Sequence, residues 1–490
     1  MLLQHGIEIA SGFSGHMCSE DSLLFHIAAF IKHTGFESEV PVESRLRVAS
    51  VADMDHRVRD VLLAREVLQP LRVFGQIESQ VRPDIMGKLR QERDEATEAH
   101  SSLEELYRTQ LDWLLENRSE AFELQTRQMF CFKNCAEVPI LSAAQRCRLL
   151  APRVSTDEEE RRPVQLHLAG TPCVAYSPRG SRLGLNHETS LVLAIYLAQR
   201  VAYAEKGLED VCFHENSVCF PAEAEVHRVL EKVGTHKCIT VRFGCQQEGW
   251  PFSRSRTFTC MYNTSTMVWL GPHDSESIDE DFNELFGKQY PVVDGSMFMV
   301  STDAEVEQEQ KEQRKRRRRH DAEDAETDAD AILTRGQEKR KKRFEEFYVS
   351  EVQSPHAAFA DINQNPPRSR VGPNITAITC KAQIYSWRHA RLATTYETML
   401  CMGLPGSRSG PPVGDCGLYS PNELSYEKMG WRARMQIVGN GQHMSSNGAF
   451  MLYCLSQLMA TSDMVADVNY ELKFCCDDDT GSDDDEEDVA

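Results

Sequence analysis

Apolar positions alternate between strand-like and helix-like spacing over roughly the first eighty residues. The stretch GIEIASGFSG (6–15) is typical of a short strand that ends in a glycine turn. Residues 19–33 have helical apolar spacing, with Ser19 in the position of an N-cap. A strand at 46–55 ends in two acids, and a helix leads to another short strand at 71–77. This alternation predicts parallel strands joined by helices.

The spacing changes between about residues 82 and 130. Leucines from Leu103 to Leu115 recur at helical intervals, and Ser102 with Glu105 forms a capping-box pattern. The region 81–164 is therefore predicted to be a helical insertion that ends in a charged linker, VSTDEEERRP. A new strand, VQLHLAG (164–170), restores the alternation of helix and strand to about residue 262.

The second half of the chain contains a long, highly charged segment. Residues 301–345 carry many charged and few apolar side chains, which predicts disorder. Apolar helical spacing returns at 449–460, before an acidic tail predicted to be disordered at 466–490. We interpret 1–80, 165–262 and 386–465 as parts of one core, with 263–385 as a smaller separate region.

Length and composition fit a large globular protein. The chain has 490 residues, of which 41% are hydrophobic, so it can bury a sizeable core in two or three domains. Its most apolar run, 191–204, is interrupted by Gln199 and Arg200. We therefore expect an intracellular protein with neither a secretory leader nor a membrane span.

The net charge of −21 hides local basic patches. Nine of the acids lie at 477–488, and without them the net charge is −12. Basic runs occur at 314–320 (RKRRRRH) and 338–344 (EKRKKRF). They suit nucleic-acid phosphates or a bipartite nuclear address, and a solvated charge run is the alternative. We expect a nuclear protein. The acidic tail suits solubility, or binding to basic proteins such as histones.

The sixteen cysteines show no repeated spacing, which favours reduced thiols over a disulfide framework. The closest group, Cys131 and Cys135 with Cys147 downstream, has no histidine pair nearby, so we expect no metal site. Cys173 differs, because it follows a proline in the loop after a buried strand, in GTPCVAYS. Taken alone, this pattern still favours a structural cysteine over a nucleophile.

The downstream sequence changes that interpretation. The strand VCFHENS carries Glu215 and Asn216 near its end, and in GWPFSRSRTF the alternating Arg254 and Arg256 would share one face of a strand. A thiol, a carboxyl group and two guanidinium groups thus follow one another along an α/β chain. The alternative is an ordinary ion pair beside a solvated sheet edge.

These segments resemble the motifs of cytosine-5 methyltransferases, in the family's order. PCVAYS resembles the Pro-Cys-x-x-x-Ser nucleophile loop, HENSV resembles Glu-Asn-Val, and GWPFSRSRTF resembles Gly-x-Pro-Gln-x-Arg-x-Arg. RLATTYETMLCMGLP (391–405) and MQIVGNGQHMS (435–445) resemble the family's later elements. The resemblance covers about 1–80, 165–262 and 380–462.

The resemblance implies roles for four residues. Cys173 would add to carbon 6 of cytosine, Glu215 would contact N3, and Arg254 with Arg256 would stabilise charge nearby. The implied methyl donor is S-adenosyl-L-methionine. A cytosine in duplex DNA would have to be flipped out of the helix to be reached.

The cofactor-binding half resembles the family more faintly. EIASGFSG (8–15) aligns with the family's Asp-Leu-Phe-x-Gly-x-Gly-Gly, but Ala10 replaces the aromatic residue and Ser14 replaces a glycine. Three further residues depart from the family pattern: Gln76 replaces an aspartate, Ser217 is inserted within Glu-Asn-Val, and Phe252 replaces a glutamine. The cofactor-binding residues that the resemblance implies are Glu8, Gly12, Gly15, Asp53, Met54, Gln76, Pro172, Gly439 and Asn440.

We therefore expect an α/β fold: a doubly wound Rossmann-like methyltransferase core with a smaller target-recognition lobe and a helical insertion. The expected activity is methylation of cytosine carbon 5 in DNA. One alternative is a tRNA cytosine-5 methyltransferase, which would suit a small recognition lobe. Another is an inactive family member that acts as a chromatin scaffold, with the insertion at 82–130 as its partner surface.

Overall fold

The computed structural model describes residues 6–13, 15, 17–34, 45–65, 68–150, 162–178, 180–287, 290–320, 333–354, 358–366, 368–404 and 429–463. The acidic tail and most of the charged linker lie outside these residues. No helix among the described residues is long and apolar enough to cross a membrane.

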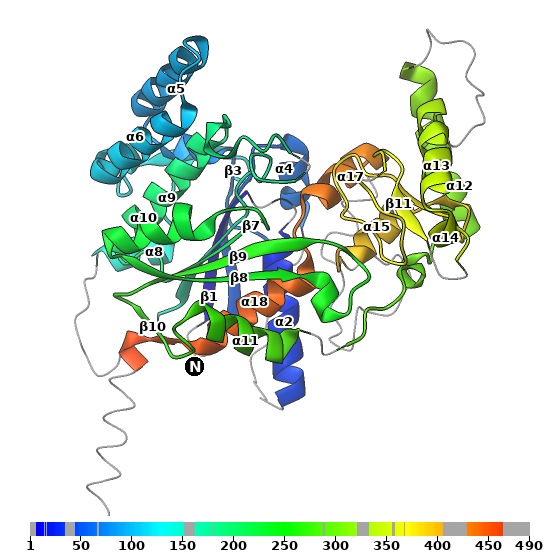
Figure 1. Cartoon of the computed structure of the whole chain (residues 1–490). Coiled ribbons are helices and arrows are strands. Elements are labelled where there is room, and N and C mark those ends of the chain that lie inside the picture. Colours follow the sequence, from blue (N-terminus) through cyan, green and yellow to red (C-terminus); the bar gives the residue numbers. More distant parts are fainter. Residues whose placement is uncertain are drawn as a thin grey trace, which may run out of the picture.

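A seven-stranded sheet forms the centre of the molecule, in the order β3-β2-β1-β6-β7-β9-β8 (Figure 1). The first five strands in this order (β3, β2, β1, β6 and β7) pair in parallel, whereas β9 is antiparallel to both of its neighbours. The order reverses at β1 and β6, which confirms the predicted doubly wound α/β class. The strands are β1 (Ile7–Gly12), β2 (Leu46–Ala52), β3 (Val73–Phe74), β6 (Val164–Ala169), β7 (Val211–Ser217), β8 (His236–Gly244) and β9 (Ser255–Asn263).

Helices cover both faces of this sheet and bury a separate apolar cluster on each. Helices α2 (Cys18–Thr34), α11 (Ser275–Phe286) and α18 (Met444–Gln457) pack on one face. Helices α9 (Ser190–Glu205) and α10 (Arg228–Val233) pack on the other. Successive strand residues point to opposite faces, so Phe213 joins the first cluster and its neighbour Cys212 joins the second.

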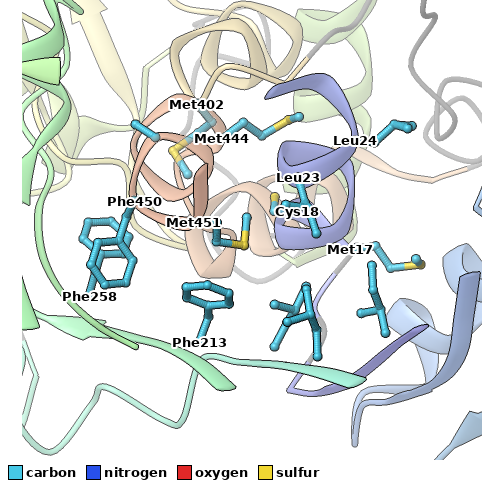
Figure 2. Close-up of a cluster of buried hydrophobic side chains, with 14 of the residues drawn as sticks. Met17, Cys18, Leu23, Leu24, Phe213, Phe258, Met402, Met444, Phe450 and Met451 are labelled. Carbon is cyan, nitrogen blue, oxygen red and sulfur yellow. The ribbon is translucent and has the colours of Figure 1, made fainter. Parts of the chain in front are cut away.

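The packing of α2 and α18 against the sheet is shown in Figure 2. The Phe450 ring of α18 lies 6.0 Å from that of Phe213 on β7 and 5.6 Å from that of Phe258 on β9, measured between centroids. Helix α2 already begins at Cys18, so the prediction that Ser19 is its N-cap is wrong: Ser19 lies in the first turn.

The predicted helical insertion contains helices α5 (Pro83–Glu98), α6 (Leu103–Glu116) and α7 (Arg118–Phe122). Ser102 caps α6 as predicted, because its hydroxyl accepts a hydrogen bond from the Glu105 N–H at 3.3 Å. The same region also holds elements that were not predicted: the hairpin of β4 (Gln128–Cys131) and β5 (Ala136–Pro139), and α8 (Ala143–Leu150). The strand expected at 71–77 is only the two residues of β3, followed by a 3-10 turn at Ile77–Gln80.

A smaller lobe is built on the three-stranded sheet of β11 (Phe359–Asp361), β12 (Ile384–Ser386) and β13 (Arg391–Leu392). Phe344 of α13 (Arg335–Phe347) is buried in this lobe's apolar cluster. The predicted boundary at residue 263 is too early. Strand β10 (Met267–Trp269) pairs with β14 (Leu458–Ala460), and α11 packs on the core, so both belong to the core.

The prediction of disorder across 301–345 is wrong at both ends of that segment. Helix α12 spans Asp303–His320 and α13 begins at Arg335. Glu309 of α12 accepts hydrogen bonds from the N–H of Thr395, at the start of α15 (Thr395–Cys401), at 2.9 and 3.1 Å. A few buried contacts therefore anchor helices whose residues are mostly charged, which composition alone could not reveal.

We predict that Phe450→Ala lowers the free energy of unfolding by about 3–5 kcal/mol, because it opens a cavity between α18 and two strands. Denaturant unfolding followed by circular dichroism measures the change. Phe347→Ala is the matched control, since that ring is 65% exposed, and it should change stability by less than about 0.5 kcal/mol. Equal effects of the two substitutions would contradict the packing described here.

Candidate active site

A cavity of about 1120 Å³ opens where the carboxyl ends of β1, β2, β6 and β7 meet. Its wall includes all four predicted catalytic residues. It also includes eight of the nine residues expected to bind the cofactor. Those wall residues are Cys173, Glu215, Arg254 and Arg256, together with Gly12, Gly15, Asp53, Met54, Gln76, Pro172, Gly439 and Asn440.

Cys173 lies in a tight turn that follows β6. Its carbonyl accepts hydrogen bonds from the N–H groups of Tyr176 (3.0 Å) and Ser177 (2.8 Å), which fixes the backbone on the carboxyl side of the cysteine. On the other side, a Cβ at Gly170 would lie 2.9 Å from the Gln442 amide nitrogen, so the end of that side chain would have to shift. The turn leaves Cys173 accessible from the cavity.

Glu215 and Arg256 form an ion pair next to this turn. Ser217 of β7 pairs with Arg256 of β9, so Glu215 and Arg256 are diagonal neighbours on one sheet face. The Arg256 Nε lies 2.6 Å from Glu215 Oε1. Burial in the cavity wall raises the pKa of the Cys173 thiol, and the Glu215 carboxylate raises it further, while the two arginines oppose both effects.

Arg254 is buried and connects three parts of the chain. Its guanidinium donates to the Ile378 carbonyl at 3.2 Å and to the Gly441 carbonyl at 2.5 Å. Burial lowers the pKa of Arg254 to about 10, with Arg256 adding to the effect, so the side chain stays charged at neutral pH. It therefore supplies a fixed positive charge to the cavity while holding the small lobe and the Gly439 segment against β9.

At the end of the cavity away from Cys173, Asp53 directly follows β2 and holds two backbone segments in place. Its carboxylate accepts from the N–H of Gly15 at 3.0 Å and from the N–H of Asp55 at 2.8 Å. Gly15 has φ +54°, and among the described residues no atom beyond its chain neighbours lies within 4 Å of where its Cβ would be, so this side of the backbone is open toward the cavity. Desolvation raises the pKa of Asp53, and its two backbone hydrogen bonds oppose the rise.

The prediction that Glu8 binds the cofactor is wrong. Glu8 is the second residue of β1, and its side chain is buried next to Ser142 and Arg47. A strand rises about 3.3 Å per residue, so Glu8 lies roughly 13 Å before the end of β1 at Gly12. Only that end reaches the cavity.

The departures from the family pattern have structural counterparts, except Ser14, which lies outside the described residues. Phe252 is fully buried and stacks on His443 at 5.9 Å between ring centroids, so this position is part of the core. The Ser217 carbonyl accepts from the Phe220 N–H at 2.8 Å, which turns the chain after β7. Ala10 lies within β1, and Gln76 lines the cavity.

Sequence reasoning missed several wall residues. Glu20, in the first turn of α2, is buried in the wall, and burial raises its pKa to about 7. The sequence feature that could have identified Glu20 is an acidic residue in the first turn of a helix that follows a glycine turn. Arg90, Asp94 and Thr97 line the cavity from α5, at the spacing of one helix face. The insertion, which the scaffold alternative treats as a partner surface, thus forms part of the cavity wall.

One group of three metal-ligand side chains occurs among the described residues, and it lies outside the cavity. Glu209, Cys212 and His236 are buried with their ligand atoms within 4.8 Å of one another. Arg200, also buried, forms an ion pair with Glu209. A guanidinium group therefore already supplies the positive charge beside this carboxylate. Cys131 and Cys135 are not part of this group.

Known proteins of similar structure are remote. No protein-family model and no curated protein sequence matches the chain. A Dnmt2 methyltransferase from S. pombe is 11% identical with a TM-score of 0.44, and covers 92% of this chain and 98% of its own. The Entamoeba histolytica methyltransferase EhMeth is 11% identical with a TM-score of 0.40, with coverages of 92% and 98%. A putative DNA modification methyltransferase from an E. coli prophage is 10% identical with a TM-score of 0.43, with coverages of 92% and 99%.

We predict that alkylation of Cys173 by iodoacetamide has its midpoint at a higher pH than that of an ordinary thiol, because desolvation by the cavity wall and the charge of Glu215 both favour the neutral thiol. Glu215→Gln should move the midpoint to lower pH, and Arg256→Gln should move it to higher pH, since each removes one charge. Mass spectrometry of the Cys173 peptide over a pH series measures both shifts. Exposed Cys219 is the control in the same digests, because it does not line the cavity. Shifts in the reverse directions would contradict the electrostatics described here.

Proposed function

We propose that the protein is an S-adenosyl-L-methionine-dependent methyltransferase that modifies carbon 5 of cytosine in DNA. One observation carries the proposal. The Cys173 thiol and the Glu215–Arg256 pair share a single cavity with the glycine turn and Asp53. Cys173 could attack a nucleic-acid base, and the carboxylate of Asp53 at the end of β2 could bind the ribose of a nucleoside-containing cofactor.

The residues at the β1–β2 end fit S-adenosyl-L-methionine. Asp53 places a carboxylate where β2 ends, and its remaining lone pairs suit ribose hydroxyls. The open backbone at Gly15 allows close approach of the cofactor's methionine portion. Met54 and Gln76 supply an apolar and an amide side chain for the adenine. When bound, the cofactor supplies an electrophilic methyl group.

Cys173 supplies the nucleophile in this proposal. Carbon 5 of cytosine is a weak nucleophile until the 5,6 double bond is polarised by addition at carbon 6. The thiolate would form a bond to carbon 6, and the π electrons of the 5,6 double bond would become available at carbon 5 for the methyl group that the cofactor supplies. Loss of the carbon-5 proton to solvent would then restore the double bond and expel the thiolate, so Cys173 returns unchanged.

Glu215 and Arg256 would act on the base edge during addition. We assign Glu215 to the N3 edge of cytosine, where its protonated carboxyl group would donate a proton or a hydrogen bond and so relieve the negative charge that the thiolate brings to the ring. The adjacent guanidinium of Arg256 and the fixed charge of Arg254 favour the same anionic state. Both faces of the base must be reached, so a duplex substrate has to present its cytosine flipped out.

A tRNA substrate is the second candidate, and the size of the lobe favours it. The sheet of this lobe has three short strands, β11 to β13, which offer little surface for reading a duplex. The basic runs at 314–320 and 338–344 lie on α12 and α13, beside this lobe, where they suit phosphate binding on either polymer. We also propose a nuclear location on the strength of these two runs.

We predict that purified protein transfers tritium from labelled S-adenosyl-L-methionine to duplex DNA, and that Cys173→Ala lowers the rate by more than about 100-fold. Total tRNA is assayed in parallel. Cys219→Ala is the matched control, because this exposed cysteine lies outside the cavity, and it should retain full activity. Label only in tRNA would replace DNA with tRNA as the substrate. Absence of label in both polymers, with cofactor binding also absent, would instead favour an inactive scaffold.

Cofactor binding can be tested without the nucleic acid. Asp53→Asn should weaken binding of S-adenosyl-L-methionine at least tenfold, or about 1.4 kcal/mol, because Asp53 both orders the Gly15 turn and faces the cavity. Isothermal titration calorimetry measures the change. Asp60→Asn, on the exposed side of the nearby helix α4 (His56–Leu63), should leave the affinity unchanged. Unchanged affinity in Asp53→Asn would place the cofactor elsewhere.

A further inference from the structure

Thr171, two residues before Cys173, is held by three buried hydrogen bonds from β7. The Asn216 amide donates to the Thr171 hydroxyl oxygen at 3.0 Å and to the Thr171 carbonyl at 3.3 Å. The same hydroxyl lies 2.7 Å from His214 Nε2. All three residues are at least 95% buried. The start of the Cys173 turn is thus bonded to the strand that also carries Glu215.

The side chains of the tripeptide His214-Glu215-Asn216 point to two different faces of the sheet. Successive residues of β7 point to opposite sheet faces, so Glu215 faces Arg256 while His214 and Asn216 face α9. The outer two residues therefore cannot touch the base that Glu215 would bind, but they reach Thr171 behind the turn.

The His214 imidazole is also connected to the far end of the turn, through Phe220. The centroid of its ring lies 5.6 Å from that of Tyr196 on α9 and 5.3 Å from that of Phe220, and the Phe220 centroid lies 4.9 Å from that of Tyr176. The Tyr176 N–H donates to the Cys173 carbonyl. His214 is thus bonded to Thr171, before the nucleophile, and is linked through Phe220 to Tyr176, after it.

The hydrogen bond between Thr171 and His214 forms with a neutral imidazole. The Thr171 hydroxyl has one hydrogen and two lone pairs, so while it accepts from Asn216 it can donate to His214 Nε2 in one neutral tautomer or accept from it in the other. Burial lowers the pKa of His214 to about 4, which keeps the ring neutral at physiological pH. The bond is therefore present across the pH range in which the thiol would act.

We propose that His214, acting through the Thr171 hydroxyl, is a positioning residue that fixes the Cys173 turn for attack. The inference deepens the proposed function and rests on it for the identity of the reaction. Nucleophilic attack depends steeply on the placement of the reacting atom, so loss of this bond should slow the chemical step and leave cofactor binding intact.

Three variants and their combination test the inference. Thr171→Val removes the hydroxyl at nearly constant volume, Thr171→Ser keeps it, and His214→Phe keeps a ring without the nitrogen. The rate constant kcat for methyl transfer is divided by the fraction of enzyme that a carbon-5-fluorinated cytosine substrate traps covalently, so unfolded protein is not counted. Thr264→Val, at an exposed threonine remote from the cavity, is the matched control.

We expect Thr171→Val and His214→Phe each to lower kcat by roughly 10- to 100-fold, with cofactor affinity within twofold. Thr171→Ser should stay within about threefold, and the double variant should be no worse than the poorer single variant, because both remove the same bond. A merely structural role would leave kcat per trapped site unchanged. That result, or equal losses in Thr171→Ser and Thr171→Val, or losses that multiply, would overturn the inference.

The rate of Cys173 alkylation separates this inference from the proposed function. If the unmodified protein transfers no methyl group, the proposed function fails, and alkylation alone decides the inference. A change of at least threefold in Thr171→Val that Thr171→Ser does not share supports the role of the hydroxyl. An unchanged rate in Thr171→Val overturns it.

Discussion

The direction of a single strand organises the whole site. Parallel strands bring their carboxyl ends to one edge of the sheet, which places Gly12, Asp53 and Cys173 there. Strand β9 runs the other way, so its beginning lies at that same edge. Arg254 and Arg256 are therefore delivered to the thiol and the carboxylate by strand polarity, without a long loop.

Charge balance in the cavity follows from this arrangement. The cavity walls desolvate Cys173, and Glu215 adds a negative charge beside it. Both effects raise the pKa of the thiol and so favour its neutral form over the thiolate. The two arginines oppose this, but Arg256 is paired with Glu215 and Arg254 is bonded to backbone carbonyls. A ligand that engages Glu215 would therefore leave more of the positive charge to a thiolate at Cys173.

Much of the fold was predictable because its signals are local. The periods of 3.6 and 2 residues located α2, α18 and strands β1, β6 and β7, and the Pro-Cys loop and the alternating arginines were legible as motifs. Helix α12 was not predictable in this way, because its order depends on Glu309 reaching Thr395, eighty-six residues away. The assignment of Glu8 failed for a related reason: only its position along β1, not its residue type, decides whether it reaches the cavity.

The sequence by itself determined the α/β alternation, the order of the chemical groups along the chain and the residues that could act as nucleophile, acid and cation. Only the tertiary structure decided which of them meet. It placed α5 of the insertion in the cavity wall, tied Arg254 to two distant carbonyls and set His214 behind Thr171. These contacts join residues far apart in the chain, and their distances depend on strand order and register, which no local pattern encodes.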